Sequence, residues 1–327
     1  MNIIKKKLVV GILARDCNSA LLQNIPKIEQ LCSAFISYDI FILENDSKDG
    51  TKNTLSEWRK NNSSVHIDLS DTNTITIPKG TEQIKYPGAS SYRIEKMAVL
   101  REKLLNWIRK DCNPDICLFL DVDICDFSVS GVISSILNAP KNWGGLFANG
   151  THTFEINGKK KRIPFQYDYF AYVPQNVSPE QQMGKHFFDV WFCPWTEWQL
   201  DRAIRKSKYL PCNSAFCGIG IYKWEIIKTF HYKTYPTSYF KTVGCSLCEH
   251  IPFNLRIIDL GYQNYISKEL IVDYGDRISW DKNSLLFRFS PLLYGFKDVI
   301  YHYFALIPKF IFNLYKCWAY EKNKNIN

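Results

Sequence analysis

The first 125 residues contain short, uninterrupted runs of apolar residues, and polar segments separate these runs. Such runs are typical of strands that are buried on both faces of a parallel sheet. The predicted strands cover residues 7–13, 39–43, 65–69 and 116–120.

Between these strands, apolar residues recur every three or four positions, which is the spacing of one face of a helix. The predicted helices cover residues 17–35, 51–59 and 91–110. The alternation of strands and helices predicts the α/β fold class, with a central sheet flanked by helices. Ligands bind such sheets at the carboxyl ends of the strands, so the residues after each strand are candidates for chemistry.

The second half of the chain has a less regular pattern. Residues 151–200 are rich in aromatic, proline and basic residues, including the run GKKKR at 158–162, and predict long loops or an irregular sheet over a site. Residues 214–222 (SAFCGIGIY) predict one strand that leads into a helix at 223–230.

The composition is that of a globular protein, with 46% hydrophobic and 22% charged residues among 327, and it excludes a largely disordered chain. The net charge of +9 favours an anionic partner, such as a phosphorylated ligand, an acidic membrane or a nucleic acid. A nucleic-acid-binding protein gathers its basic residues into a stripe with interleaved aromatics. Apart from residues 158–162 the basic residues are scattered, so we expect no nucleic acid as a partner.

The eleven cysteines have spacings that match no zinc site, and Cys245 and Cys248 form a lone CxxC. We expect reduced, buried thiols. The apolar part of the amino-terminal segment is too short for a signal peptide, and no stretch of 18 residues lacks charge. We therefore expect a cytoplasmic protein.

The segment ICLFLDVDI at 116–124 is the sharpest chemical feature, because an apolar strand runs directly into Asp121-x-Asp123. Alternate residues of an extended chain point the same way, so both carboxylates can face one ligand. Two carboxylates at this spacing suit a hard divalent cation, Mn²⁺ or Mg²⁺, that also bridges to phosphates. The alternative is a solvated turn with two acids.

Two further features accompany this pair. The segment FILENDSKDGT at 41–51 places acids and small residues after a predicted strand, and it could also cap the helix that begins near Thr51. The helix at 91–110 carries Arg93 and Arg101, whose guanidinium groups suit phosphate. For Arg93 the charged outer face of an amphipathic helix is the simpler interpretation, whereas for Arg101 both interpretations stay open.

The order of these features resembles the GT-A (Rossmann-like) fold of nucleotide-sugar-dependent glycosyltransferases. The segments RIEKMAVLREKLL…LFLDVDI, SAFCGIGIYKWE and CEHIPFNLRI resemble the cryptococcal-type, capsule-associated α-1,3-mannosyltransferase family and its bacterial relatives. The resemblance implies a GT-A-like catalytic domain over residues 1–285 with a mixed central sheet. It also implies metal-dependent transfer of a hexose, with mannose favoured, from a nucleoside diphosphate sugar to a glycan or lipid-linked acceptor in capsule or lipopolysaccharide synthesis.

The resemblance also implies roles for individual residues. The donor-binding residues would be Ala14, Arg15, Asp16, Glu44, Asn45, Asp46, Arg93, Arg101 and Asp121. Those after the first two strands would lie beside the base and ribose, and Arg101 would face the diphosphate. Asp121 would contact the ribose or the metal, and Asp123 would bind the metal directly.

Acceptor-side chemistry is expected farther along the chain. Glu249 is the candidate general base for an inverting reaction, and His250 could complete the metal site or orient the acceptor. The alternative is a pair of residues that packs and caps a helix start. Three aromatic residues could stack on a sugar or belong to the core: Trp191, Trp195 and Trp198.

Residues 286–327 form a separate segment. Residues 299–320 predict an amphipathic helix, with Lys309 and Lys316 on a narrow polar face, that lies on an acidic membrane or packs on protein. We therefore expect peripheral attachment to the inner face of the cytoplasmic membrane.

Other functions stay open at this stage. A galactosyl- or glucosyltransferase with a UDP-sugar donor would have the same motifs, in a retaining or an inverting enzyme. A metal-dependent nucleotidyltransferase also pairs aspartates on a strand, but it needs a Gly-rich phosphate loop, and the segment GILARDCNS at 11–19 is not one.

Overall fold

The computed structural model describes residues 3–73, 90–156, 159–164, 168, 170–180, 200, 202–235 and 246–275. The chain divides into two compact units, Met1–Asp276 and Arg277–Asn327, and every described residue belongs to the first unit. The predicted helix at 299–320 lies outside the described residues, as do Cys245 and the three candidate sugar-stacking tryptophans.

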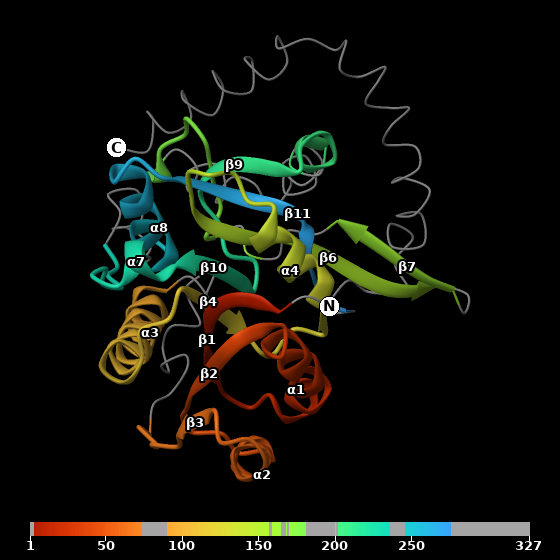
Figure 1. Ribbon diagram of the computed structural model, residues 1–327, viewed down its shortest axis with the longest axis vertical. Helices are drawn as coiled ribbons and strands as arrows, with labels where there is room; N and C mark the ends of the chain where they lie inside the picture. The colour runs from red at the N-terminus through yellow and green to blue at the C-terminus, as the bar shows by residue number, and fades with distance from the viewer. Residues whose placement is uncertain are drawn as a thin grey trace, which may run out of the picture. The chain divides into compact units, whose positions relative to one another are not determined.

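The described strands form one sheet with the order β3-β2-β1-β4-β10-β6-β11-β9-β8, while β5 pairs with β11 and β7 with β6 (Figure 1). The strands are β1 Ile4–Ala14, β2 Phe35–Glu44, β3 Val65–Asp68, β4 Ile116–Asp121, β5 Asp126–Phe127, β6 Trp143–Ile156, β7 Lys159–Pro164, β8 Val173–Pro174, β9 Tyr209–Ser214, β10 Ile219–Lys223 and β11 Gln263–Asp273. The first four strands are parallel, and β10 runs antiparallel between β4 and β6. The sheet is therefore mixed, as predicted.

Helices cover both faces of this sheet (Figure 1). They are α1 Asn18–Cys32, α2 Thr51–Asn61, α3 Ser91–Asp111, α4 Val129–Leu137, α7 Trp224–Ile227 and α8 His250–Asp259. Val10 packs in the core that contains α1, α2 and α4, and its neighbour Val9 packs in the core that contains α3, α7 and α8. Because both valines are fully buried, the continuous apolar runs are explained by a sheet that is covered on both faces. The predicted fold class is confirmed.

One predicted strand is wrong, and the helix predicted at 17–35 is shorter, because α1 ends at Cys32 and Phe35 begins β2. Residues 214–222 do not form a single strand, because β9 ends at Ser214 and β10 begins at Ile219. Cys217 and Gly218 between them have φ values of 52° and 84°, so the chain turns there in the left-handed region that glycine tolerates best. The helix expected at 223–230 is the short α7.

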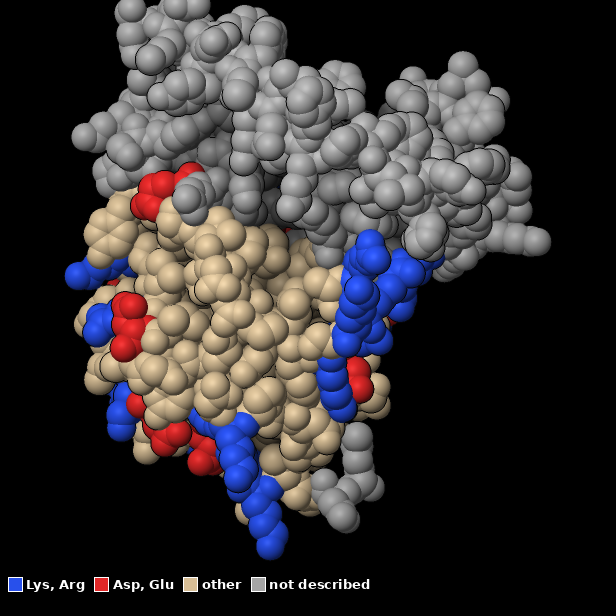
Figure 2. Space-filling view, turned by 90° about the horizontal axis from the view of Figure 1, so that it is seen from above, with Lys and Arg blue, Asp and Glu red and all other residues tan. Residues whose placement is uncertain are grey.

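The region expected to form loops or an irregular sheet is partly regular. Residues 151–164 contain the antiparallel ladder of β6 and β7, in which Thr151 is paired with Pro164 and Ile156 with Lys159. The basic run at 158–162 thus lies mostly on a strand. On the face shown in Figure 2, Lys and Arg side chains stand in several separate groups with uncharged surface between them. Within the described ranges, no helix is both long and apolar enough to cross a membrane.

Candidate active site

The carboxyl ends of three neighbouring parallel strands bring the predicted site residues to one edge of the sheet. In the register of β1 with β2, Ala14 is the partner of Glu44, and in the register of β1 with β4, Leu13 is the partner of Asp121. The loops after β1, β2 and β4 therefore begin side by side. This is the place in an open α/β sheet where ligands bind.

Hydrogen bonds tie the loop after β1 to the loop after β2. The backbone N–H of Asp16 donates to Ser47 Oγ at 2.9 Å, and the N–H of Lys48 donates to Asp16 Oδ1 at 2.7 Å. The N–H of Cys17 donates to Thr51 Oγ1 at 3.0 Å. Because these bonds connect backbone to side chain in both directions, the two loops act as one unit.

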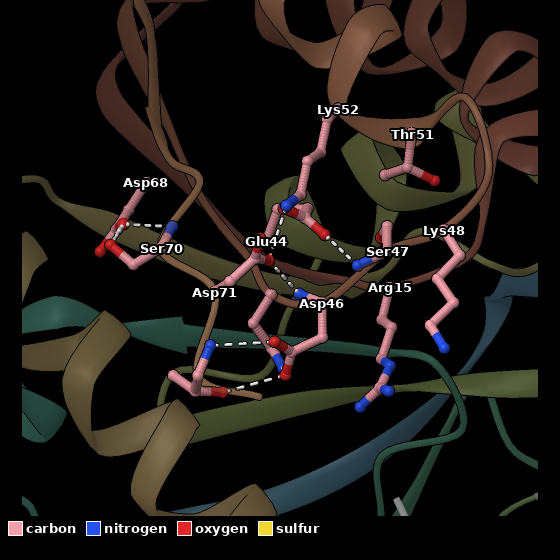
Figure 3. Close-up of polar contacts among 12 residues, drawn as sticks. Arg15, Glu44, Asp46, Ser47, Lys48, Thr51, Lys52, Asp68, Ser70 and Asp71 are labelled. Carbon is pink, nitrogen blue, oxygen red and sulfur yellow. Dashed lines mark hydrogen bonds and ion pairs between the residues drawn. The ribbon is translucent and has the colours of Figure 1, made fainter. Parts of the chain in front are cut away.

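Asp46 fixes a third loop, the one after β3 (Figure 3). Its Oδ1 accepts hydrogen bonds from the N–H groups of Thr72 and Asn73 at 2.9 and 2.7 Å, and its Oδ2 accepts from Asn45 Nδ2 at 2.9 Å. The backbone of Asp46 has a φ of 60°, and its N–H donates to Asp71. The predicted donor residues Asn45 and Asp46 are thus engaged in shaping the rim of the site.

Glu44 is a buried carboxylate beneath this rim. Its Oε1 accepts from the Ser47 N–H at 2.8 Å, and its Oε2 lies 3.7 Å from Lys52 Nζ.

In Figure 3 the side chains of Arg15 and Lys48 point in the same direction. Burial, together with the charge of Arg15, lowers the pKa of Lys96 on α3, so these two cations are close enough to interact.

Arg101 occupies the centre of the site, on the inner face of α3. Its Nε donates to Glu249 Oε1 at 2.9 Å, its Nη2 donates to Asp121 Oδ1 at 3.4 Å, and its guanidinium lies 4.9 Å from the centre of the Phe216 ring. Burial opposes the charged form, but the carboxylates of Asp121 and Glu249 outweigh this effect and raise the pKa of Arg101. The side chain is 6% exposed, so it is a buried cation held between two carboxylates.

Glu249 and His250 stand at the start of α8. The Glu249 side chain makes no capping hydrogen bond to the helix, and its Oε2 accepts from the Cys248 thiol at 3.6 Å. The His250 ring stacks on Phe216 with a centroid separation of 3.9 Å. Burial, and the nearby Arg101, lower the pKa of His250 well below its usual value, so the imidazole is neutral.

Several carboxylates near the predicted metal position act on one another's pKa values. Burial raises the pKa of Asp121 despite the nearby Arg101, and the charges of Asp123 and Asp168 add to this rise. Burial also raises the pKa of Asp168 to about 6, an effect that Glu249 strengthens and that Arg101 and Arg93 oppose. Asp168 was missed by the sequence reasoning, because no local motif marks it.

The donor set fits a hard divalent cation. Asp121 and Asp123 offer oxygen ligands whose mutual repulsion a cation would relieve. Among the residues that the structure describes, no three His, Cys, Asp or Glu side chains are grouped so that they could hold a metal ion. Mg²⁺ is commonly bound by one or two carboxylates together with phosphate oxygens of the substrate, so two carboxylates suffice for such a site. The metal role of His250 stays a prediction.

The structure brings together residues that are far apart in the sequence: Arg101, Asp121, Glu249 and His250 meet around Phe216. Arg93, on the same helix as Arg101, acts electrostatically on Asp168. Two nitrogens of Arg101, Nε and Nη2, donate to Glu249 and Asp121, and the predicted contact of Arg101 with a diphosphate stays a prediction. Arg15, Lys48 and Lys52 are cations of the tied loops and of the helix start after them, and the charge of Arg15 also acts on Lys96.

No family model matches the chain, and no curated protein matches it. Solved structures similar to it include the mannosyltransferase PcManGT from Pyrobaculum calidifontis in complex with GDP-Man and Mn²⁺, with a TM-score of 0.46, 9% identity and coverage of 85% of this chain and 59% of that chain. S. aureus TarS 1–349 in complex with UDP-GlcNAc gives a TM-score of 0.39, 12% identity and coverage of 85% and 61%. GalNAc-T7 with UDP, GalNAc and Mn²⁺ gives a TM-score of 0.43 and 13% identity, and the match covers 86% of this chain and 45% of that chain.

The chain spans less than two thirds of the length of each of these three structures. At these scores and identities, the likeness assigns no activity to this chain.

Proposed function

We propose that the chain is a metal-dependent glycosyltransferase. It moves a hexose, with mannose favoured, from a nucleoside diphosphate sugar to a glycan or lipid-linked acceptor. The observation that carries this proposal is the Asp121-x-Asp123 pair at the carboxyl end of β4, beside the tied loops after β1 and β2. The resemblance of the sequence motifs to the mannosyltransferase family supports the sugar.

Each part of a donor would find a suitable group at this edge of the sheet. Asp121 and Asp123 would hold Mn²⁺ or Mg²⁺, which stabilises the charge that develops on a departing diphosphate. The positive charges of Arg15 and Lys96 interact unfavourably, so a diphosphate bound beside them would relieve their mutual repulsion. The base and ribose would lie by Ala14 and the loop of Glu44, whose backbone the hydrogen bonds hold in place.

The acceptor hydroxyl must lose a proton during transfer. In an inverting reaction a carboxylate takes this proton, and Glu249 is the residue predicted from the sequence. In a retaining reaction the departing phosphate takes it. Asp168 is a further carboxylate near these groups. Its charge raises the pKa of Asp121, and the charge of Glu249 raises the pKa of Asp168.

The metal claim is tested with Asp123→Ala, measured as release of nucleoside diphosphate in the presence of an acceptor. We expect the variant, and the wild type in excess chelator, to lose transfer while the fold stays intact. Asp259→Ala is the matched control, because Asp259 is exposed at the end of α8. Full transfer in excess chelator contradicts the proposal.

The location of the enzyme in the cell is proposed from the segment 286–327, which contains the predicted amphipathic helix. Residues 299–320 would lie on the inner face of the cytoplasmic membrane and bring the enzyme to lipid-linked acceptors of capsule or lipopolysaccharide synthesis. Deletion of residues 299–327 should move the protein from the membrane fraction to the soluble fraction, with donor binding retained. Aggregation of the truncated protein would instead show that the segment packs on protein.

The second candidate is a galactosyl- or glucosyltransferase that uses a UDP-sugar, because a metal held by the paired aspartates would bind a diphosphate whatever the base. A panel of nucleotide sugars separates the two, since the true donor alone should be consumed. Release of pyrophosphate from a nucleoside triphosphate would indicate the nucleotidyltransferase alternative.

A further inference from the structure

Glu249 is bonded in a way that does not suit a proton acceptor. Its Oε1 accepts from Arg101 Nε at 2.9 Å, its Oε2 accepts from the Cys248 thiol at 3.6 Å, and the residue is 4% exposed. A general base must reach the proton that it removes, directly or through one water. Both oxygens of this carboxylate face protein groups instead.

Arg101 connects Glu249 to Asp121, because it donates a hydrogen bond to each of them. The guanidinium is planar, so the direction of its Nε bond fixes the direction of its other N–H groups. Nη2 donates to Asp121 Oδ1 at 3.4 Å, and the Phe216 ring lies 4.9 Å from the guanidinium carbon. In the described part of the chain, Asp121 Oδ2 has no hydrogen-bond donor, so this oxygen is left for a ligand.

Aromatic contacts hold the start of α8, and therefore Glu249, in place. His250 stacks on Phe216 at 3.9 Å, and Tyr232 stacks on Phe253 of the same helix at 4.2 Å. The two bonds of Arg101 join residues that are 148 and 20 positions apart in the chain, so α3 connects α8 with the end of β4. The backbone of Asp121 is fixed independently, because its N–H donates to the Gly218 carbonyl at 2.9 Å.

We propose that Glu249 is a positioning residue, which holds Arg101 so that Arg101 directs Asp121 toward the metal and the donor, and that Glu249 does not take the acceptor proton. This inference rests on the proposed function. It gives Arg101 a role in orienting a metal ligand, in place of direct contact with the diphosphate. Groups that orient metal ligands in this way typically change metal affinity or activity by about 10–100-fold when they are removed.

The near-isosteric variant Glu249→Gln decides between the two roles. Its amide oxygen can still accept from Arg101 Nε, but an amide cannot take up a proton as a carboxylate does. For a positioning residue, we expect kcat at saturating donor and Mn²⁺ to stay within about tenfold of the wild type. For a general base, kcat should fall by about 10²–10⁴-fold. A fall larger than tenfold under these conditions overturns the proposal.

A second readout does not depend on turnover. Titration of Mn²⁺ in the presence of the nucleoside diphosphate alone should show about 10–100-fold weaker metal binding for Glu249→Ala, with recovery in Glu249→Gln. Equal Mn²⁺ affinity in Glu249→Ala, Glu249→Gln and the wild type overturns the proposal. Glu57→Gln is the control, because Glu57 is exposed on α2 and, among the residues that the structure describes, pairs with Lys60 and Asn61 alone.

The two proposals fail in different ways. If the wild type neither binds Mn²⁺ with a nucleoside diphosphate nor transfers a sugar, the proposed function is wrong. If the wild type does both and Glu249→Gln loses kcat beyond tenfold with unchanged Mn²⁺ affinity, only the positioning role is wrong. Circular dichroism of each variant establishes that it has the wild-type fold, and Glu249→Gln alone settles the question where Glu249→Ala does not fold.

Discussion

Replacement of Arg101 by methionine should destabilise the protein strongly, and the effect should depend on pH. The variant leaves Glu249, which is 4% exposed, without its guanidinium partner. Breaking a buried ion pair from one side typically costs about 3–5 kcal/mol. The same substitution also removes the charge that lowers the pKa values of Asp121 and Asp168 in the wild type.

The pH effect follows from these two carboxyl groups. Without Arg101 their pKa values rise further, and each additional unit of rise costs about 1.4 kcal/mol of stability at a pH above the raised pKa. A carboxyl group with a raised pKa costs stability only in its charged form, so the stability lost in Arg101→Met should return in part as the pH falls from about 7.5 to about 5.5.

The measurement is urea unfolding of metal-free protein at both pH values, for Arg101→Met and for Arg101→Met/Glu249→Gln. The second substitution replaces the unpaired carboxylate of Glu249 by a neutral amide, so the double variant should be more stable than Arg101→Met. A loss of stability in Arg101→Met that is equal at the two pH values, or a double variant no more stable than the single one, would refute the reasoning.

Three further predictions concern stability and donor binding. Because the pKa of Asp168 is raised to about 6, its contribution to stability is lost as the pH rises through that value, so Asp168→Asn should raise Tm more at pH 7.5 than at pH 5.0 in thermal scans. A Cβ on Gly131 would lie 1.8 Å from the carbonyl oxygen of Glu269, so Gly131→Ala should cost about 1–3 kcal/mol or more in urea unfolding, and an unchanged midpoint would contradict the packing of α4 on β11. Asp46→Ala removes the acceptor of the Thr72 N–H, so calorimetry should show at least about tenfold weaker donor binding, and wild-type affinity would exclude this loop from the donor site.

Local pattern predicted the parallel half of the sheet because each of its strands is buried on both faces. The runs at 7–13 and 116–120 lie within β1 and β4, and the helix expected at 91–110 is α3. The strand β6 escaped prediction, since its sequence WGGLFANGTHTFEI mixes glycine and polar residues with apolar ones. A strand in such a sequence depends on pairing with distant partners, which here are β10 and β11.

The site was predictable only in part, for a similar reason. Asp121-x-Asp123 carries a local signal, because it follows an apolar strand. The burial of Arg101 could also have been predicted, since it follows Ile94 and Ala98 at the spacing of the inner face of α3 and precedes Leu105 on that face. Asp168 could not have been found in this way, because its role depends on groups brought close by the fold.

Binding of a nucleoside diphosphate sugar in the presence of Mn²⁺ tests the central claim most directly. Thermal unfolding is followed for the wild type and Asp123→Ala with each member of a donor panel, in Mn²⁺ and in excess chelator. A ligand at 100 times its Kd stabilises the native state by about 2.7 kcal/mol, which gives a readily measured rise in Tm. We predict that one donor raises the Tm of the wild type in Mn²⁺ and has no such effect in chelator or in Asp123→Ala. Equal stabilisation in Asp123→Ala or in chelator, or none from any donor, would contradict the account.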